Sequence, residues 1–248
     1  MNAAEIFKKA YISYSRLSSY DKCPRKFKYA YLDGHPTTSG RAAQVGKLVH
    51  EVIADYLRVK SALGGTIQTD VADIVSGLTR VADRMKEEKE IDMDISANDM
   101  DVFFRGFCAL YPRINTDMIA GIEIEKNFDI NGYTCKGVVD LVLQDENGKI
   151  NIIDYKTGRP GYVDDLQLIL YSMPYIEEYP GQAIAGAFAF LREPSIRRVD
   201  ISPSMANNSR DIVVGRVEEI EADERFERKR SRLCDFCEFR RLCDGDSN

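Results

Sequence analysis

The sequence predicts an α/β fold, with a helical first half followed by a sheet. Apolar, largely β-branched residues flank a turn within residues 137–154, which is typical of a β-hairpin. Helical spacing of apolar residues precedes this hairpin, and a further helix with two strand-like segments follows it. At 248 residues and 44% hydrophobic composition, the chain can bury a substantial core. We therefore expect a single domain over residues 1–248 with accessory elements.

Helices are expected throughout the first half. The expected helices cover residues 13–31, 46–59, 71–89 and 99–111. The first carries Cys23 and the second carries His50, and the Gly64-Gly65 pair ends the second helix. We expect residues 46–115 to form a helical lobe.

Strands are expected from residue 121 onward. In residues 121–130, Glu123 and Glu125 occupy alternate positions; we expect both to be exposed, with a supplementary metal ligand as the alternative. Glu146-Asn147-Gly148 is the expected turn of the hairpin. The remaining expected elements are strands at residues 183–191 and 197–201, a loop at Asn207, Asn208 and Ser209, and a strand or helix at residues 212–220.

Two acids and a lysine in the hairpin predict a metal site. Asp140 lies in the first strand, Asp154 follows fourteen positions later, and Lys156 comes after one intervening residue. Side chains alternate along a strand, so Asp154 and Lys156 share a face, and register can bring Asp140 beside them. Paired carboxylates favour Mg²⁺ or Mn²⁺, and a nearby ammonium can activate water for attack on a phosphodiester. An isolated Asp-x-Lys motif is more often two solvated side chains on an exposed strand. The residues around the motif must therefore distinguish a metal site from this alternative.

That surrounding pattern resembles the PD-(D/E)xK nuclease superfamily, and within it the RecB-like branch. The matching residues are Gly137, Asp140, Asp154, Tyr155, Lys156, Thr157 and Gly158. The resemblance implies a restriction-endonuclease-like core over residues 120–202, a mixed central sheet flanked by helices. It also implies that Asp140 and Asp154 hold the metal and that the Tyr155 carbonyl completes the coordination. Lys156 then positions the water and stabilises charge on the phosphate.

Two further motifs agree with this resemblance. Gly46 precedes His50 by four positions, and the family has a histidine in this setting that completes the metal site and favours Mn²⁺. Taken alone, a helical histidine is more often a packed or capping residue. Gln167 and Tyr171 lie one helical turn apart on one face. The resemblance implies that this pair faces the active site and contacts DNA; the alternative is an ordinary amphipathic helix.

Cysteine spacing indicates a second metal site. The six cysteines are Cys23, Cys108, Cys135, Cys234, Cys237 and Cys243. The last three form Cys-x2-Cys-x5-Cys, which suits thiolate coordination, and Cys23 is the natural fourth ligand. RecB-like nucleases of the AddB type and CRISPR-associated RecB-like exonucleases share this arrangement, which implies a [4Fe-4S] cluster joining residues 11–32 to residues 220–248. A four-cysteine zinc site remains the alternative, and Cys108 and Cys135 are expected to be small buried hydrophobes.

The charge of the chain restricts how it can bind nucleic acid. A formal charge of −6 argues against coating DNA through overall charge, so any binding surface must be local. Two basic patches are candidates: Lys22, Arg25, Lys26 and Lys28, and Arg225, Arg228, Lys229, Arg230 and Arg232. Aromatic residues that could stack on unpaired bases are Tyr29, Tyr31, Phe236 and Phe239. For each patch, a solvated helix face is the alternative.

The expected function is a metal-dependent DNA nuclease, an exonuclease acting on single strands or duplex ends. Gln167, Tyr171, Arg25 and Lys26 are the expected DNA contacts. We expect the protein to act in one of two pathways. One is CRISPR spacer acquisition, with integrase subunits as partners, and the other is DNA recombination or repair, with helicase subunits as partners. The alternative is a DNA-binding adaptor of a larger complex with little activity of its own. The sequence contains no apolar signal region or membrane span, so we expect a cytoplasmic protein with reduced thiols.

Overall fold

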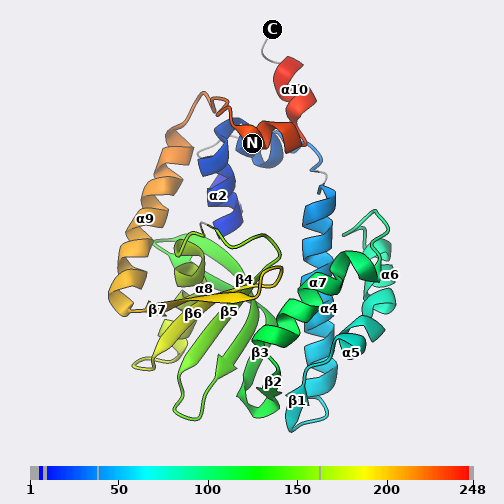
Figure 1. Ribbon diagram of the computed structural model, residues 1–248. Coiled ribbons are helices and arrows are strands. Elements are labelled where there is room, and N and C mark those ends of the chain that lie inside the picture. The colour runs from blue at the N-terminus through cyan, green and yellow to red at the C-terminus, as the bar shows by residue number, and fades with distance from the viewer. Residues whose placement is uncertain (1–5, 8–9, 38, 162, 246–248) are drawn as a thin grey trace. The chain divides into compact units, whose positions relative to one another are not determined.

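A five-stranded mixed sheet, in the order β3-β4-β5-β6-β7, is the centre of the fold (Figure 1). Its strands are β3 (Ile119–Ile130), β4 (Tyr133–Gln144), β5 (Ile150–Lys156), β6 (Ile184–Phe190) and β7 (Ser195–Ile201). β4 pairs antiparallel with β5, β5 parallel with β6, and β6 antiparallel with β7. The predicted α/β fold, with a mixed central sheet flanked by helices, is confirmed.

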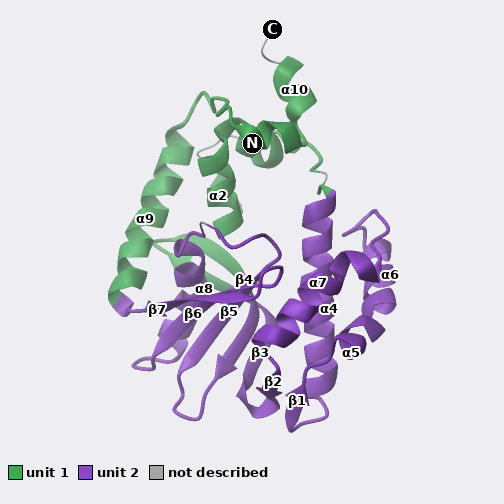
Figure 2. Ribbon diagram, viewed as in Figure 1, with its two compact units in different colours: residues 1–40, 127–137, 204–248 green, residues 41–126, 138–203 purple. Residues whose placement is uncertain are grey.

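The computed structural model describes residues 6–7, 10–37, 39–161 and 163–245. The chain divides into unit 1, residues 1–40, 127–137 and 204–248, and unit 2, residues 41–126 and 138–203 (Figure 2). Residues 246–248, the last three of the cluster element expected over residues 220–248, lie outside the described residues.

The predicted hairpin is formed by β4 and β5. Leu141 pairs with Ile153 across the two strands, and both side chains are buried. Gly148 adopts φ = 81° in the connecting turn, a conformation that glycine reaches without steric cost. From β5 the chain continues through α8 (Leu166–Glu178) to the parallel strand β6, because parallel neighbours need a crossover. α8 packs against β5 and β6.

The helical region of unit 2 packs against one face of the sheet. It consists of α4 (Arg41–Ser61), α5 (Val71–Ser76), α6 (Leu78–Glu87) and α7 (Ala97–Leu110). Ile153 and Tyr155 of β5 belong to the same buried cluster as these helices. The helix expected over residues 71–89 is broken at Gly77, whose N–H caps the end of α5. A small antiparallel sheet of β1 (Thr66–Gln68) and β2 (Arg113–Asn115), which the sequence did not predict, accompanies the helices.

Unit 1 joins segments from both halves of the sequence. Its helical elements are α2 (Tyr14–Lys22), α3 (Pro24–Phe27), the π-helical turn η1 (Lys28–Leu32), α9 (Pro203–Ala222), the 3₁₀ turn η3 (Arg232–Phe236) and α10 (Arg240–Gly245). Ser13 caps α2, but Cys23 separates α2 from α3, because a residue before proline disfavours helical geometry. The Phe27 and Phe226 rings stack with centroids 6.3 Å apart. The Tyr20 hydroxyl donates to Asp223 Oδ2 at 2.8 Å.

The loop expected at Asn207, Asn208 and Ser209 is wrong, because these residues lie within α9. Asn207 and Asn208 are exposed on this helix. The buried positions of α9 recur at helical spacing: Ala206, Ser209, Val213, Val217 and Ile220. Burial of this face outweighs the weak helix propensity of asparagine. None of the helices in the described residues combines the length and apolarity needed to cross a membrane.

Replacing Gly106 by alanine is expected to destabilise the protein strongly. Gly106 lies in α7, and a Cβ atom there would overlap the Leu191 carbonyl oxygen, a backbone atom that cannot rotate away. We expect a loss of about 1–3 kcal/mol or more in the free energy of unfolding. Gly215→Ala in α9 is the matched control, because among the described residues no atom outside its adjacent residues and its own helix backbone lies within 4 Å of the position that its added methyl group would take. Denaturant unfolding of both variants checks the prediction, and equal stabilities would contradict it.

Candidate active site

Two buried carboxylates meet where β4 and β5 pair. The register that pairs Leu141 with Ile153 brings Asp140 alongside Asp154, and their exposed fractions are only 7% and 6%. Asp140 Oδ2 accepts a hydrogen bond from the Tyr155 backbone N–H at 2.5 Å. The Tyr155 side chain packs away from the carboxylates, with its ring 5.7 Å from that of Phe107. The structure thus shows the alternation expected along β5.

Lys156 and Gln167 hold Asp154 between them. Lys156 Nζ lies 2.8 Å from Asp154 Oδ2 and donates to Gln167 Oε1 at 2.8 Å. Gln167 Nε2 donates to Asp154 Oδ1 at 2.7 Å and lies 3.2 Å from the Tyr171 hydroxyl. The Gln167 and Tyr171 pair on α8 therefore faces the two acids. The same helix also buries Leu166, Ile169 and Leu170, as an amphipathic helix would, and contact of the pair with DNA stays a prediction.

His50 reaches the carboxylates from α4. Its Nδ1 atom lies 3.1 Å from Asp140 Oδ1, and its ring contacts the edge of Tyr155 at 5.9 Å between centroids. Gly46 lies one turn earlier, where a Cβ atom would be 3.2 Å from Thr157 Oγ1. The small residue at position 46 thus lets α4 approach the end of β5 closely.

Glu123 belongs to the same group, and the expectation that it is exposed is wrong. Its Oε1 atom is buried and has no hydrogen-bond partner among the described residues. His50, Glu123 and Asp140 each place one ligand atom within 4.8 Å of the others. Glu123 adopts φ = 49°, which interrupts the alternation of the strand. Glu125 is exposed, as expected.

The charges of this group fit a divalent cation. Burial and the neighbouring Asp140 raise the pKa of Asp154 to about 6, and the same two causes raise the pKa of Glu123 to about 8. Burial lowers the pKa of His50, but Asp140 outweighs it by charge and hydrogen bond and raises that pKa to about 9. Clustered acids that retain protons near neutral pH are relieved by a bound cation. A donor set of imidazole and carboxylates suits Mn²⁺ or Mg²⁺.

Affinity for Mn²⁺ is expected to rise with pH. Raised pKa values mean that Glu123 and His50 carry protons at neutral pH, and these protons must leave when the residues bind a cation. We expect the affinity to increase by at least about tenfold between pH 6 and pH 8. Calorimetric titration of metal-free protein in buffers of different ionisation enthalpy measures both the affinity and the released protons. An affinity that is flat or falls over this range would contradict the prediction.

Four cysteines lie around one cavity in unit 1. Cys23, Cys234, Cys237 and Cys243 all line it, together with Arg25 and Arg228 among other residues. All four are free thiols, and burial raises the pKa of Cys243. The structure therefore brings together the four cysteines singled out by spacing, and this donor set fits an iron-sulfur cluster or zinc. Cys135 is buried in β4 as expected, whereas Cys108 in α7 is only partly buried.

The expected nucleic-acid contacts of unit 1 gather at the same cavity. Arg25 and Lys26 line it, Arg25 Nε donates to the Phe226 carbonyl at 3.0 Å, and Lys26 pairs with Glu238 at 2.9 Å. Tyr29 and Phe239 are buried and cannot stack on bases, which corrects that expectation. Phe236, by contrast, is 88% exposed.

Comparisons with known proteins agree with this geometry. A family described as the PD-(D/E)XK nuclease superfamily matches residues 11–244. The chain is 27% identical over 217 residues to one subunit of the ATP-dependent helicase/deoxyribonuclease of Carboxydothermus hydrogenoformans, covering 72% of this chain but only 20% of that protein. A crystal structure of a proposed exonuclease from Eubacterium rectale superposes with a TM-score of 0.53 at 17% identity, covering 94% of this chain and 88% of the other.

Proposed function

Because the chain belongs to the PD-(D/E)XK nuclease superfamily, we propose that it is a divalent-metal-dependent DNA nuclease whose catalytic residues are Asp140, Asp154 and Lys156. The observation that carries this proposal is the convergence of the two buried acids with the partly exposed Lys156 and His50. The helicase/deoxyribonuclease relative and the structural neighbour fit the RecB-like branch of the superfamily.

One set of residues in the site is proposed to bind the metal. Asp140, Asp154 and His50 would hold the metal, with the Tyr155 carbonyl completing the coordination and the unpartnered Glu123 carboxylate oxygen as an additional ligand. When bound, such an ion supplies Lewis-acid activation of water and neutralises charge on the phosphate.

Lys156 is proposed to take part in catalysis without binding the metal. Its ammonium, held 2.8 Å from both Asp154 and Gln167, orients the attacking water and stabilises negative charge developing on the phosphate. Gln167 fixes the position of this ammonium and, with Tyr171, offers polar atoms to the DNA strand.

The substrate that we propose is single-stranded DNA or a duplex end, cut exonucleolytically. The matched relative is named as part of a helicase/deoxyribonuclease, which supports DNA as substrate and a helicase as partner in recombination or repair. This chain spans about a fifth of that protein. Trimming of DNA before CRISPR integration, beside an integrase, is the second setting that we propose.

The four cysteines in unit 1 are proposed to bind a [4Fe-4S] cluster. Their convergence on one cavity, from positions more than 200 residues apart, supports a shared inorganic centre. Its role is structural, joining the segment after α2 to the segment around η3. Zinc bound by the same thiols is the outcome that would replace the cluster.

A single preparation tests the proposal. Protein purified anaerobically is analysed for iron, zinc and its visible spectrum, and is then incubated with single-stranded DNA with and without Mn²⁺. Brown protein with about four irons per chain and Mn²⁺-dependent cleavage is expected. DNA binding without cleavage would instead support the adaptor function, and colourless, zinc-containing protein would exclude the cluster.

A further inference from the structure

We propose that Arg58 and Arg84 form a binding site for the phosphate backbone of the DNA strand, beside the catalytic centre. The inference rests on the proposed nuclease function and adds the residues that hold its substrate. Arg58 belongs to α4 and Arg84 to α6, and both belong to unit 2, as do the catalytic residues.

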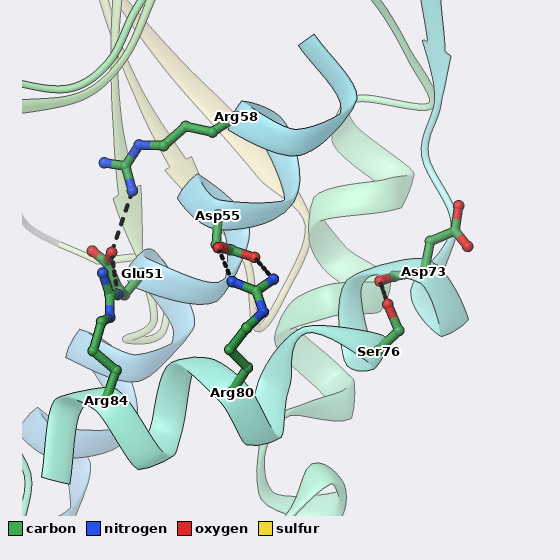
Figure 3. Close-up of polar contacts among 7 residues, drawn as sticks. All are labelled: Glu51, Asp55, Arg58, Asp73, Ser76, Arg80 and Arg84. Carbon is green, nitrogen blue, oxygen red and sulfur yellow. Dashed lines mark hydrogen bonds and ion pairs between the residues drawn. The ribbon is translucent and has the colours of Figure 1, made fainter. Parts of the chain in front are cut away.

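Both arginines converge on a single acid, Glu51 (Figure 3). Arg58 Nη1 lies 3.3 Å and Arg84 Nη2 lies 2.6 Å from the same oxygen atom, Glu51 Oε1. Two guanidinium groups carry about ten N–H donors and two positive charges, whereas one carboxylate supplies a single negative charge. The group therefore has a net positive charge and unused donors. Each arginine side chain is 45% exposed, so solvent, or a phosphate, can reach it.

The neighbouring ion pair between Arg80 and Asp55 shows an arginine with a carboxylate of its own on the same two helices. Arg80 Nη1 and Nη2 bond Asp55 Oδ1 and Oδ2, both at 2.7 Å, as two parallel hydrogen bonds (Figure 3). This fork geometry uses both carboxylate oxygens and balances the charges one to one. Arg80 thus joins α6 to α4 structurally, whereas the pair at Glu51 leaves charge available for another anion.

The location of this excess charge fits a DNA strand entering the catalytic centre. Glu51 directly follows His50 in α4. The centre itself is acidic, and the chain carries a formal charge of −6. A phosphodiester backbone approaching such a site needs local cations, which Arg58 and Arg84 provide.

Guanidinium groups recognise phosphate by paired hydrogen bonds and charge, without contacting bases. The bound segment is therefore the sugar-phosphate backbone, and the contact is independent of sequence. When DNA binds, its phosphate oxygens accept hydrogen bonds from the guanidinium N–H groups that Glu51 does not bind. Glu51 then either keeps both guanidinium groups aligned or releases one of them to the phosphate.

Binding of a fluorescent single-stranded oligonucleotide in EDTA tests the site without requiring cleavage. We expect the R58A/R84A double variant to weaken binding by about tenfold and to reduce the salt slope by about 1.4, which corresponds to two phosphate contacts. Arg80→Ala is the matched control, because it removes an α4–α6 ion pair that is already balanced; its affinity should equal that of the wild type. Glu51→Gln removes the competing charge and should bind DNA at least as tightly as the wild type.

A purely structural role for the two arginines predicts the opposite pattern. Removing Glu51 would then weaken binding as much as removing the arginines, and this result would overturn the proposal, as would equal losses in R80A. The R58K/R84K variant keeps the charges and should retain the salt slope even if the double alanine variant unfolds. Measuring cleavage by the wild type distinguishes failure of the phosphate-site proposal from failure of the proposed nuclease function. If the wild type cuts DNA and R58A/R84A binds it normally, the phosphate site is refuted while the nuclease function stands.

Discussion

Replacing Lys156 by alanine is expected to reduce the rate of DNA cleavage by about 10²–10⁴-fold while leaving DNA binding within about threefold of the wild type. The Lys156 ammonium is the cation that contacts both Asp154 and Gln167, so its loss removes the charge that would stabilise the phosphate during attack. Single-turnover cleavage of labelled single-stranded DNA in Mn²⁺ measures the rate. Fluorescence anisotropy in EDTA measures the binding.

Lys149→Ala is the control for this experiment. Lys149 belongs to the same hairpin, but its ammonium lies 3.8 Å from the exposed Asp200 and not among the buried acids. Its cleavage rate should match that of the wild type. A Lys156→Ala protein that still cuts at the wild-type rate would remove the proposed catalytic assignment, and loss of binding together with cleavage would indicate a misfolded site.

The part of the site that lies on the hairpin could be predicted from the sequence, because strand alternation alone places Asp154 and Lys156 on one face. Asp140 followed from the register of the same hairpin. His50 and Gln167 lie on helices far from each other in sequence, and only the resemblance to a known family connected them to the acids. Their contacts with Asp140 and Asp154 depend on tertiary packing that no local pattern encodes.

Other features lacked any local signal. Glu123 occupies an alternating position that predicts exposure, but its Oε1 atom is buried and its φ angle is positive, which glutamate rarely adopts. The small sheet pairs Ile67 with Ile114 through three-residue strands, too short for a periodic pattern. In α9, Asn207 and Asn208 suggested a loop, but burial of the opposite helix face decided the structure. Each failure reflects long-range packing that outweighs a local preference.

Replacing Cys23 by serine is expected to remove the proposed cluster and to destabilise unit 1. Cys23 lies between α2 and α3, whereas the other three cavity cysteines lie beyond residue 230. A cluster joining them closes a loop of more than 200 residues. A cross-link over so long a loop contributes about 5 kcal/mol by restricting the unfolded chain. We therefore expect iron to fall from about four per chain towards zero and Tm to fall by about 10–20 °C.

Cys108→Ser separates this effect from the general cost of losing a thiol. Cys108 is partly buried in α7 and lies in unit 2, outside the cysteine cavity, so its variant should keep full iron content and show only a small change in Tm. Iron analysis and thermal unfolding under anaerobic conditions compare the two variants directly. If Cys23→Ser retained its iron, the fourth ligand would have to be another group, and the two chain segments would be joined by contacts such as the Phe27 and Phe226 stacking and the Tyr20 and Asp223 hydrogen bond.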